Sequence, residues 1–206
     1  MSSEAQSTRI TEDDYMARER EAETKSEYLR GEVFAMAGGS PRHNVIVTNI
    51  ARAFPKEMPC VILSSDQRVH VAETGLYTYP DVTVLCGAMQ THPRFPENLV
   101  NPSIVFEVLS PSTEAYDRGA KFAHYRRIPS LREYVLVSQS WPLVEHYERG
   151  EKGWNLTTWA APATHVLLPS IGIRLALADI YAKVELLDPS SPADAAPVLP
   201  RPKALS

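Results

Sequence analysis

Apolar positions along this chain follow a helical period in some segments and the period of a strand in others. Apolar residues that recur every three or four positions indicate a helix, whereas continuous or alternating apolar runs indicate a strand. Gly and Pro separate most of these segments. The pattern predicts helices at residues 11–24, 41–54 and 115–128, and strands at 31–36, 60–71, 79–86, 103–109, 133–138, 142–149 and 153–159.

Helices and strands in this order predict an α/β or α+β fold in which helices cover a sheet core, and the last two strands are expected to form an antiparallel hairpin. A chain of 206 residues with 44% hydrophobic content suits one domain with a sizeable core, which we expect over residues 11–183. The Pro- and Ala-rich residues 184–206 carry too little apolar surface to offset the cost of ordering. We expect them to form a mobile tail.

Two of the predicted strands carry a carboxylate that their apolar pattern does not explain. Asp81 follows Pro80 and opens one apolar run, and Glu107 interrupts another at residues 104–109. Burying an unpaired carboxylate is costly, so such a strand needs a cation, a hydrogen-bond network or a reaction to explain it. If the two acids meet, their oxygens and the carbonyl oxygen of Val108 would suit Mg²⁺ or Mn²⁺.

Each acid also has a simpler explanation when it is taken alone. Asp81 after Pro80 is a common turn residue. Glu107 could pair with an arginine or lie at a solvated edge position. The occurrence of both acids in strands favours a shared metal site over two unrelated explanations.

The helix predicted after Glu107 is the most basic element of a chain whose net charge is −4. Lys121 lies one to two turns into this helix, at a rise of about 1.5 Å per residue, so its flexible side chain could return an ammonium group to the strand end. Tyr125 lies one turn further along the same side. The simpler alternative is a surface pair between Asp117 and Lys121, which contributes about 0.3–0.5 kcal/mol.

Four other residues could border the same cleft, although residues of these types are usually solvated or capping: Glu27, Glu32, His43 and Asp66. The sequence Gly38-Gly39-Ser40 lacks the lysine of a phosphate-binding loop, and no Gly-x-Ser-x-Gly elbow of a serine hydrolase occurs.

Cysteine usage and the distribution of apolar and charged residues favour one cellular compartment for this protein. Cys60 and Cys86 have no zinc-binding spacing, so we expect two buried free thiols in a reducing cytoplasm. No apolar run reaches about 18 residues, and the first 30 residues are rich in charge, so we expect a cytoplasmic protein without a membrane span or a secretion signal. The net negative charge argues against nonspecific coating of nucleic acid.

Five segments resemble the Uma2-like family of restriction endonuclease domains within the PD-(D/E)XK nuclease superfamily, and the resemblance extends over residues 11–182. It implies a restriction-endonuclease-like fold with a mixed central sheet, flanking helices and an acidic site at an opening of the sheet. The segments are Gly31-Glu32 to His43, Ser64-Ser65-Asp66, Tyr79-Pro80-Asp81-Val82, Glu107-Val108-Leu109-Ser110-Pro111-Ser112-Thr113, and Asp117 through Lys121 to Tyr125.

The resemblance also implies roles for individual residues. The two acids of the superfamily fall on Asp81 and Glu107, whereas the lysine expected two residues later is replaced by Leu109. Lys121 on the next helix matches the pattern of the family itself. A further acid would map to Glu27 or Glu32.

The implied activity is hydrolysis of DNA by an endonuclease that uses Mg²⁺ or Mn²⁺, with Asp81, Glu107 and Lys121 as catalytic residues. Enzymes of this superfamily that cut duplex DNA often act as homodimers. Two alternatives remain open: a nuclease-derived module that binds DNA or a protein without cutting, and a metal enzyme that acts on a small phosphorylated molecule. Three arginines of the basic helix could contact backbone phosphates: Arg118, Arg126 and Arg127.

Overall fold

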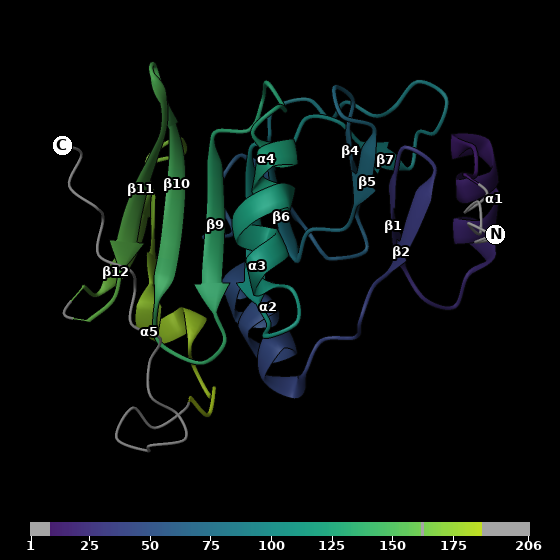
Figure 1. Cartoon of the computed structure of the whole chain (residues 1–206). Coiled ribbons are helices and arrows are strands. Elements are labelled where there is room, and N and C mark those ends of the chain that lie inside the picture. Colours follow the sequence, from purple (N-terminus) through teal and green to yellow (C-terminus); the bar gives the residue numbers. More distant parts are fainter. Residues whose placement is uncertain (1–8, 162, 187–206) are drawn as a thin grey trace, which may run out of the picture.

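The computed structural model describes residues 9–161 and 163–186, and two large sheets form its framework (Figure 1). Its elements are α1 (Glu12–Glu21), β1 (Ser26–Leu29), β2 (Glu32–Ala35), α2 (Pro41–Ala53), β3 (Cys60–Leu63), β4 (Arg68–Val71), β5 (Leu76–Thr78), β6 (Val82–Cys86), β7 (Asn98–Leu99), β8 (Ile104–Leu109), α3 (Glu114–Tyr116), the π-helical turn η1 (Asp117–Lys121), α4 (Phe122–Tyr125), β9 (Glu133–Ser138), β10 (Val144–Gly150), β11 (Gly153–Trp159), β12 (His165–Leu168), β13 (Ile173–Ala176) and α5 (Leu177–Ile180).

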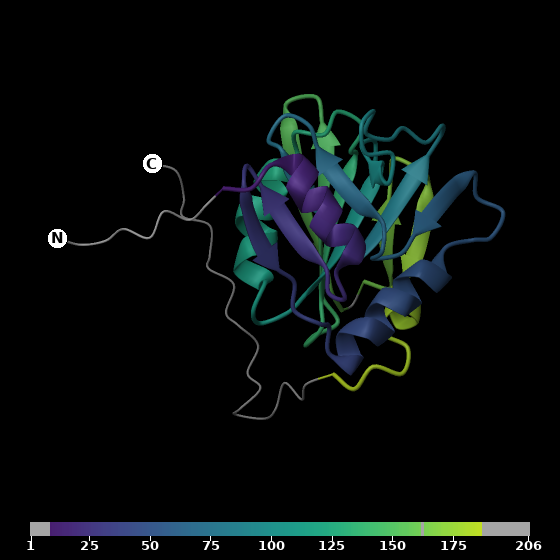
Figure 2. The same cartoon turned by 90° about the vertical axis from the view of Figure 1, so that its right-hand side faces the viewer.

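The larger sheet has six strands in the order β11-β10-β9-β8-β6-β3. Strands β8 and β9 are parallel and are joined by the helical segment α3–η1–α4, whereas the other neighbours are antiparallel. The smaller sheet has the order β2-β1-β5-β4-β7, and α1 lies across its outer face (Figure 2). Mixed sheets flanked by helices confirm the predicted fold class.

Strand β8 separates two apolar cores, because alternate residues of a strand point to opposite faces. Ile104, Phe106 and Val108 belong to a core that includes α2 and α5, whereas Val105 and Leu109 belong to a core that includes α4 and β4. The helical segment α3–η1–α4 contributes Tyr125 to the core that contains Val105. Glu107 shares this second face, as its spacing predicts.

Side-chain caps explain where the two longer helices begin. The hydroxyl oxygen of Thr11 accepts the backbone N–H of Asp14 at 3.1 Å, and the Asp14 carboxylate accepts the backbone N–H of Thr11, so α1 begins with a capping box. Ser40 caps α2 in the same way by accepting the N–H of His43 at 3.1 Å. The cap of α2 fixes the position of His43 in its first turn.

The predicted elements are wrong at several boundaries. The strand predicted at residues 60–71 is two strands, β3 and β4, in different sheets, because a turn closed by Gln67 N–H and the Ser64 carbonyl separates them. The strand predicted at residues 79–86 begins at Val82, because Pro80 lies between the two sheets. Six of the elements of four residues or fewer were missed, because such short segments display little period: β1, β5, β7, β12, β13 and α5.

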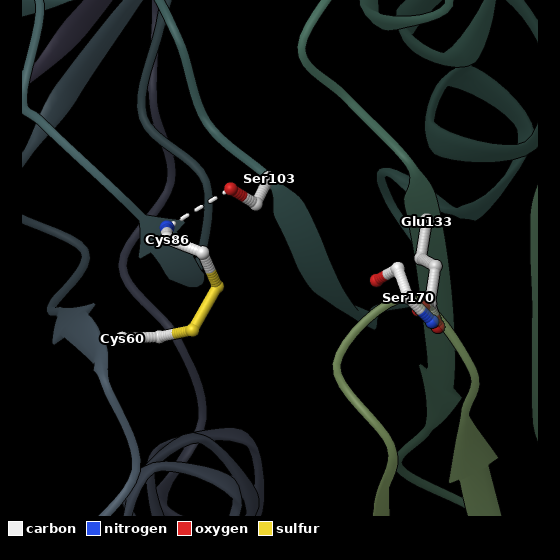
Figure 3. Close-up of a disulfide and its surroundings, with 5 residues drawn as sticks. All are labelled: Cys60, Cys86, Ser103, Glu133 and Ser170. Atoms are coloured by element: carbon white, nitrogen blue, oxygen red, sulfur yellow. Dashed lines mark hydrogen bonds between the residues drawn. A yellow bond between two sulfur atoms is a disulfide. The ribbon is translucent and has the colours of Figure 1, made fainter.

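Cys60 and Cys86 form a disulfide, so the prediction of two free thiols is wrong (Figure 3). Strands β3 and β6 pair antiparallel with the two cysteines directly opposite one another, and their Cα atoms are 4.3 Å apart. A separation of 26 residues along the chain conceals this proximity, because strand register cannot be read from one sequence. The expectation of a reducing compartment, which rested on two free thiols, therefore loses its support.

The predicted mobile tail lies mostly outside the described residues, which end at Leu186. Val184 and Leu186, at its start, pack against the core that includes α2. Among the residues that the structure describes, no helix has the length and apolarity needed to cross a membrane.

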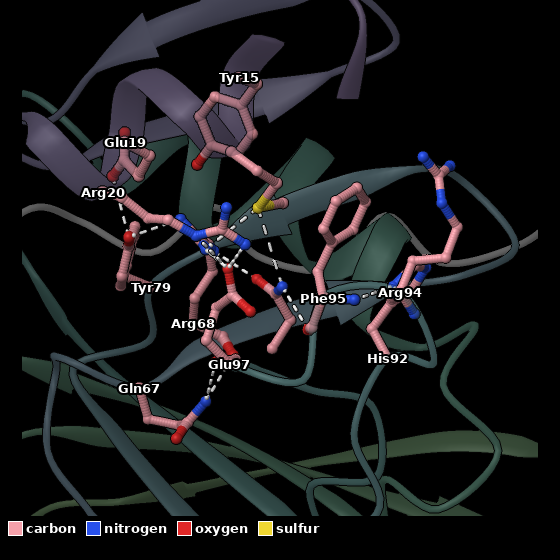
Figure 4. Close-up of polar contacts among 12 residues, drawn as sticks. Tyr15, Glu19, Arg20, Gln67, Arg68, Tyr79, His92, Arg94, Phe95 and Glu97 are labelled. Atoms are coloured by element: carbon pink, nitrogen blue, oxygen red, sulfur yellow. Dashed lines mark hydrogen bonds and ion pairs between the residues drawn. The ribbon is translucent and has the colours of Figure 1, made fainter. Parts of the chain in front are cut away.

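Arg68 on β4 is buried and joins α1 to the five-stranded sheet (Figure 4). Its guanidinium donates to the side chains of Asn98 and Tyr79, the latter at 3.0 Å. The same group contacts the sulfur of Met16 at 3.1 Å and lies 3.7 Å from the carboxylate of Glu97. One side chain therefore connects α1, β4 and the segment around β7.

His70, also on β4, is buried without a hydrogen-bond partner for either ring nitrogen among the described residues. Its ring stacks on Tyr77 at a centroid distance of 4.1 Å, and His92 lies edge-on at 4.8 Å. Burial, reinforced by His92, lowers the pKa of His70 to about 4. The folded protein therefore holds this imidazole neutral over most of the acid range.

We expect His70→Phe to make the protein less sensitive to acid. The unfolded chain binds a proton at His70 below pH about 6.5, whereas the folded chain binds it only near pH 4, so folding stability falls as the pH drops through this window. Phenylalanine should remove a loss of about 3 kcal/mol between pH 7 and pH 4. Urea unfolding at several pH values measures the difference, with exposed His165→Phe as the control. Equal pH dependence in wild type and His70→Phe would contradict the expectation.

Candidate active site

Two carboxylates meet where β6 begins beside β8. These strands pair antiparallel with Val82 opposite Phe106, so Asp81 and Glu107 occupy the next pair of facing positions. The Oδ2 atom of Asp81 accepts the backbone N–H of Val108 at 2.7 Å. The structure therefore brings together the two acids that the sequence analysis assigned to one site.

Glu107 is 3% exposed and is held by two side chains of the helical segment that follows β8. Its Oε1 atom accepts the hydroxyl of Tyr125 at 3.0 Å and lies 2.9 Å from Nζ of Lys121. Burial raises the pKa of Glu107 well above its usual range, and the ammonium of Lys121 opposes this rise only in part. The negative charges of Asp117 and Asp81 raise it further.

The π-helical turn η1 places Asp117 and Lys121 on the buried side of its segment. Both side chains are in the interior, and Nζ of Lys121 lies 3.6 Å from Oδ1 of Asp117. The two residues do pair, but the alternative of a surface pair is wrong, because Lys121 is only 5% exposed. Turns of this kind within helices are rare and frequently occur at functional sites.

Glu27 reaches the same ammonium group from the other sheet. Its Oε1 atom lies 3.4 Å from Nζ of Lys121, and its Oε2 atom accepts the hydroxyl of Tyr116 at 2.9 Å. Thr78 on β5 also donates to this carboxylate. The site is therefore assembled from both sheets and from the helical segment between β8 and β9.

Acidic groups outnumber basic groups in this interior cluster. Burial alone would lower the pKa of Lys121, but the carboxylates of Glu107, Glu27 and Asp117 outweigh it, so the pKa rises well above its usual value. Burial also raises the pKa of Asp117. Lys121 is therefore charged at neutral pH, whereas burial and the neighbouring carboxylates favour proton binding at Glu107 and Asp117.

The oxygen atoms at this strand end fit a hard divalent cation. Val108 donates its N–H to Asp81, and the N–H and C=O of a strand residue point to the same edge, so the Val108 carbonyl lies on the side of Asp81. No group of three or more His, Cys, Asp or Glu side chains that could hold a metal ion occurs within residues 9–161 and 163–186. A metal here would therefore depend on two carboxylates and backbone oxygen.

His43 lies at the border of the site, as the sequence analysis expected. Its Nε2 atom is 3.1 Å from Oδ2 of Asp81. Burial would lower the pKa of His43, but Asp81 outweighs this effect and the pKa is raised. His43 therefore contacts one of the two acids directly.

The structure does not bring the other two candidates into the cluster. Glu32 is exposed on the edge strand β2, and Asp66 is exposed in a turn where it pairs with Lys25 at 2.6 Å. Two residues that do contact the cluster were missed: Thr78 and Tyr116. Neither has a distinctive sequence context. Thr78 lies two residues before Pro80, and Tyr116 lies in the first turn of the helical segment after β8.

The arginines of the basic helix have acidic partners on the protein. Arg118 pairs with Glu114 at 2.8 Å and also with Glu145 on β10. Arg127 pairs with Glu73 at 3.0 Å, and Arg126 is exposed. Arg118 therefore also anchors its helix to the six-stranded sheet.

Comparison with known proteins agrees with this architecture. The family described as "Putative restriction endonuclease" (Uma2) matches residues 12–178. The Synechocystis sp. protein sll1609 is 40% identical over 156 residues, which are 72% of this chain and 86% of the relative. The Synechocystis sp. protein slr1290 is 35% identical over 177 residues, which are 84% of this chain and 92% of the relative.

A solved structure shares the fold at low sequence identity. The crystal structure described as "a putative nuclease belonging to DUF820" from Anabaena variabilis superposes with a TM-score of 0.67 at 17% identity. The match covers 84% of this chain and 97% of that chain. By its family match and its close relatives, the chain belongs to the Uma2 family, "Putative restriction endonuclease".

Proposed function

We propose that this chain is an endodeoxyribonuclease that hydrolyses phosphodiester bonds with the help of Mg²⁺ or Mn²⁺. The observation that carries the proposal is the meeting of Asp81, Glu107 and Lys121 at one strand end, where buried acids outnumber bases. The family description and the nuclease title of the solved structure support the same class of reaction.

In this proposal, Asp81, Glu107 and the carbonyl of Val108 hold the cation. A divalent ion at such a site lowers the pKa of a bound water and offsets charge on a phosphate. Tyr125 fixes the carboxylate of Glu107 by donating to it at 3.0 Å. The N–H of Val108 fixes Asp81 in the same way.

Lys121 would hold the attacking water or stabilise the charge that develops on the phosphate. Its ammonium group is fixed by three carboxylates, so it requires no reorganisation during the reaction. Lys121 would thus replace the lysine that the superfamily carries at the position of Leu109. Leu109 itself is buried in the apolar core around Tyr125.

Contacts with DNA outside the centre would come from the basic helix. Arg126 is exposed, whereas Arg118 and Arg127 would have to exchange their acidic partners for phosphates. Binding should weaken as the salt concentration rises. A homodimer could pair through β11, the edge of the six-stranded sheet, where Leu156 is 53% exposed.

A non-cutting module remains the second candidate, because the centre is so deeply buried. Glu27, Glu107 and Lys121 all lie in the interior, which restricts the approach of a phosphate. Calorimetric titration with Mn²⁺ separates the two candidates. Binding that Asp81→Asn abolishes supports the nuclease, and absence of such binding supports the module.

We expect Asp81→Asn and Glu107→Gln to lower cleavage of plasmid and linear DNA by about 10²–10³-fold in the presence of Mg²⁺ or Mn²⁺. Each substitution keeps the shape of the side chain and removes its negative charge. Asp66→Asn is the matched control, because Asp66 is exposed and pairs with Lys25 outside the centre. Full activity of Asp81→Asn or Glu107→Gln would refute the assignment.

A further inference from the structure

His43 reaches Asp81 from the opposite side of the six-stranded sheet to Lys121. It lies in the first turn of α2, whose buried residues Ile46 and Ile50 pack in the core of Phe106. Lys121 lies over the other face, on the side of Glu107. The first turn of α2 must therefore reach the start of β6 for His43 Nε2 to approach Asp81 Oδ2 at 3.1 Å.

The two hydrogen bonds to Asp81 converge on one oxygen atom. Oδ2 accepts the N–H of Val108 at 2.7 Å and faces His43 Nε2 at 3.1 Å. Because a carboxylate only accepts, His43 donates through Nε2–H. Oδ1 makes no hydrogen bond within the described part of the chain, so this oxygen is available to a further ligand.

The first turn of α2 is itself fixed to the end of the sheet. The hydroxyl of Ser40 accepts the N–H of His43 at 3.1 Å and donates to the side chain of Gln139 at 3.0 Å. Gln139 directly follows β9. These contacts fix the backbone from which the His43 side chain extends, and Asp81 fixes the position of its imidazole.

Gly39 makes room for the imidazole. A Cβ atom at Gly39 would lie 2.6 Å from Nδ1 of His43 and 2.9 Å from Oδ1 of Asn44, which is closer than real Cβ contacts. A Cβ atom at the neighbouring Gly38 would meet nothing within 4 Å. Neither glycine has a positive φ, so alanine at either position tests space alone.

We propose that His43 is a positioning residue that holds Asp81 with Oδ1 directed to the cation. The proposal rests on the proposed function, because it assigns Asp81 to a metal. Groups that hydrogen-bond metal-binding carboxylates fix their orientation, and losing such a group costs about 10–100-fold in affinity or activity. The Gly38-Gly39-Ser40 segment, which is no phosphate-binding loop, then holds His43 in position: Gly39 leaves space for its ring, and Ser40 accepts its backbone N–H.

Four variants of the full chain test the proposal by calorimetric titration with Mn²⁺. His43→Phe keeps a ring and removes the donor, and Gly39→Ala displaces the ring. We expect both to weaken Mn²⁺ binding about tenfold or more, whereas His43→Gln, which keeps an N–H, and Gly38→Ala should stay within about twofold of wild type. Thermal melting verifies that each variant is folded. Wild-type affinity in folded His43→Phe and Gly39→Ala would overturn the proposal.

A second measurement needs no metal and distinguishes this proposal from the proposed function. The amide proton of Val108 reports the orientation of Asp81, because it bonds to Oδ2 at 2.7 Å. Its NMR resonance should shift in His43→Phe and Gly39→Ala and should stay in place in Gly38→Ala. An unchanged Val108 resonance in both of the first two variants overturns the positioning role. If the wild-type chain binds no Mn²⁺, the proposed function fails, and the Val108 resonance alone decides the role of His43.

Discussion

Replacing Lys121 with methionine is expected to lower DNA cleavage by about 10²–10³-fold or more, the largest effect of any single substitution outside the two acids. Methionine keeps most of the length of the side chain and removes the only basic group within 4 Å of Glu107 among the described residues. A plasmid-nicking assay with Mg²⁺ measures the loss. The matched control is Lys56→Met, because Lys56 is exposed after the end of α2.

The same substitution should also reduce stability, because it leaves buried carboxylates without their cation. Removing one partner of a buried ion pair typically costs about 3–5 kcal/mol. Glu107 would bind a proton in response, since burial already raises its pKa. The loss of cleavage must therefore be distinguished from unfolding.

A double variant makes this distinction. Combining Lys121→Met with Glu107→Gln removes one charge of each sign, so urea unfolding should show that part of the lost stability returns. Cleavage should not return, because the cluster then lacks both groups. Wild-type cleavage by folded Lys121→Met would show that Lys121 has no part in the reaction.

Replacing Arg68 with methionine is expected to cause a large loss of stability, about 1–3 kcal/mol for each buried group left without its donor. Arg68 is 5% exposed, and its guanidinium is shared by Asn98, Tyr79 and the sulfur of Met16. Without it, buried polar groups of α1 and of the five-stranded sheet lose their common donor. Urea unfolding followed by circular dichroism measures the change.

Arg94→Met is the matched control for Arg68. Arg94 pairs with Asp13 of α1 at 2.7 Å, so it too connects α1 to the loop before β7, but its side chain is 60% exposed. Water and salt screen such a pair, and its removal should leave the unfolding midpoint unchanged. Equal effects of the two substitutions would show that burial of Arg68 does not determine its contribution.

The long elements and two of the acids could be predicted from the sequence because their signals are local. The apolar run around Glu107 and the helical period of residues 41–54 each depend on residues a few positions apart. The position of Lys121 could be predicted in part, since a helix places it within reach of the preceding strand end. Its π-helical turn leaves no mark in the sequence.

The remaining features depend on pairing between distant segments, which one sequence does not encode locally. Glu27 enters the centre because β1 joins the sheet of β5, yet β1 is only four residues long. The disulfide between Cys60 and Cys86 depends on the register of β3 against β6. In the sequence, Asp66 and Glu27 are equally good candidates for the border of the site. The fold buries Glu27 and leaves Asp66 exposed.

The centre spans two sheets, and this arrangement determines how heat would disable it. Glu27 and Thr78 belong to the five-stranded sheet, whereas Asp81 and Glu107 lie at the six-stranded one. Proteins open locally at free energies well below that of complete unfolding. An opening that separates the sheets would take Glu27 away from Lys121 while the larger sheet stays intact. We therefore expect heating to disrupt the centre before it unfolds the larger sheet, with the packing of one sheet against the other setting the first temperature.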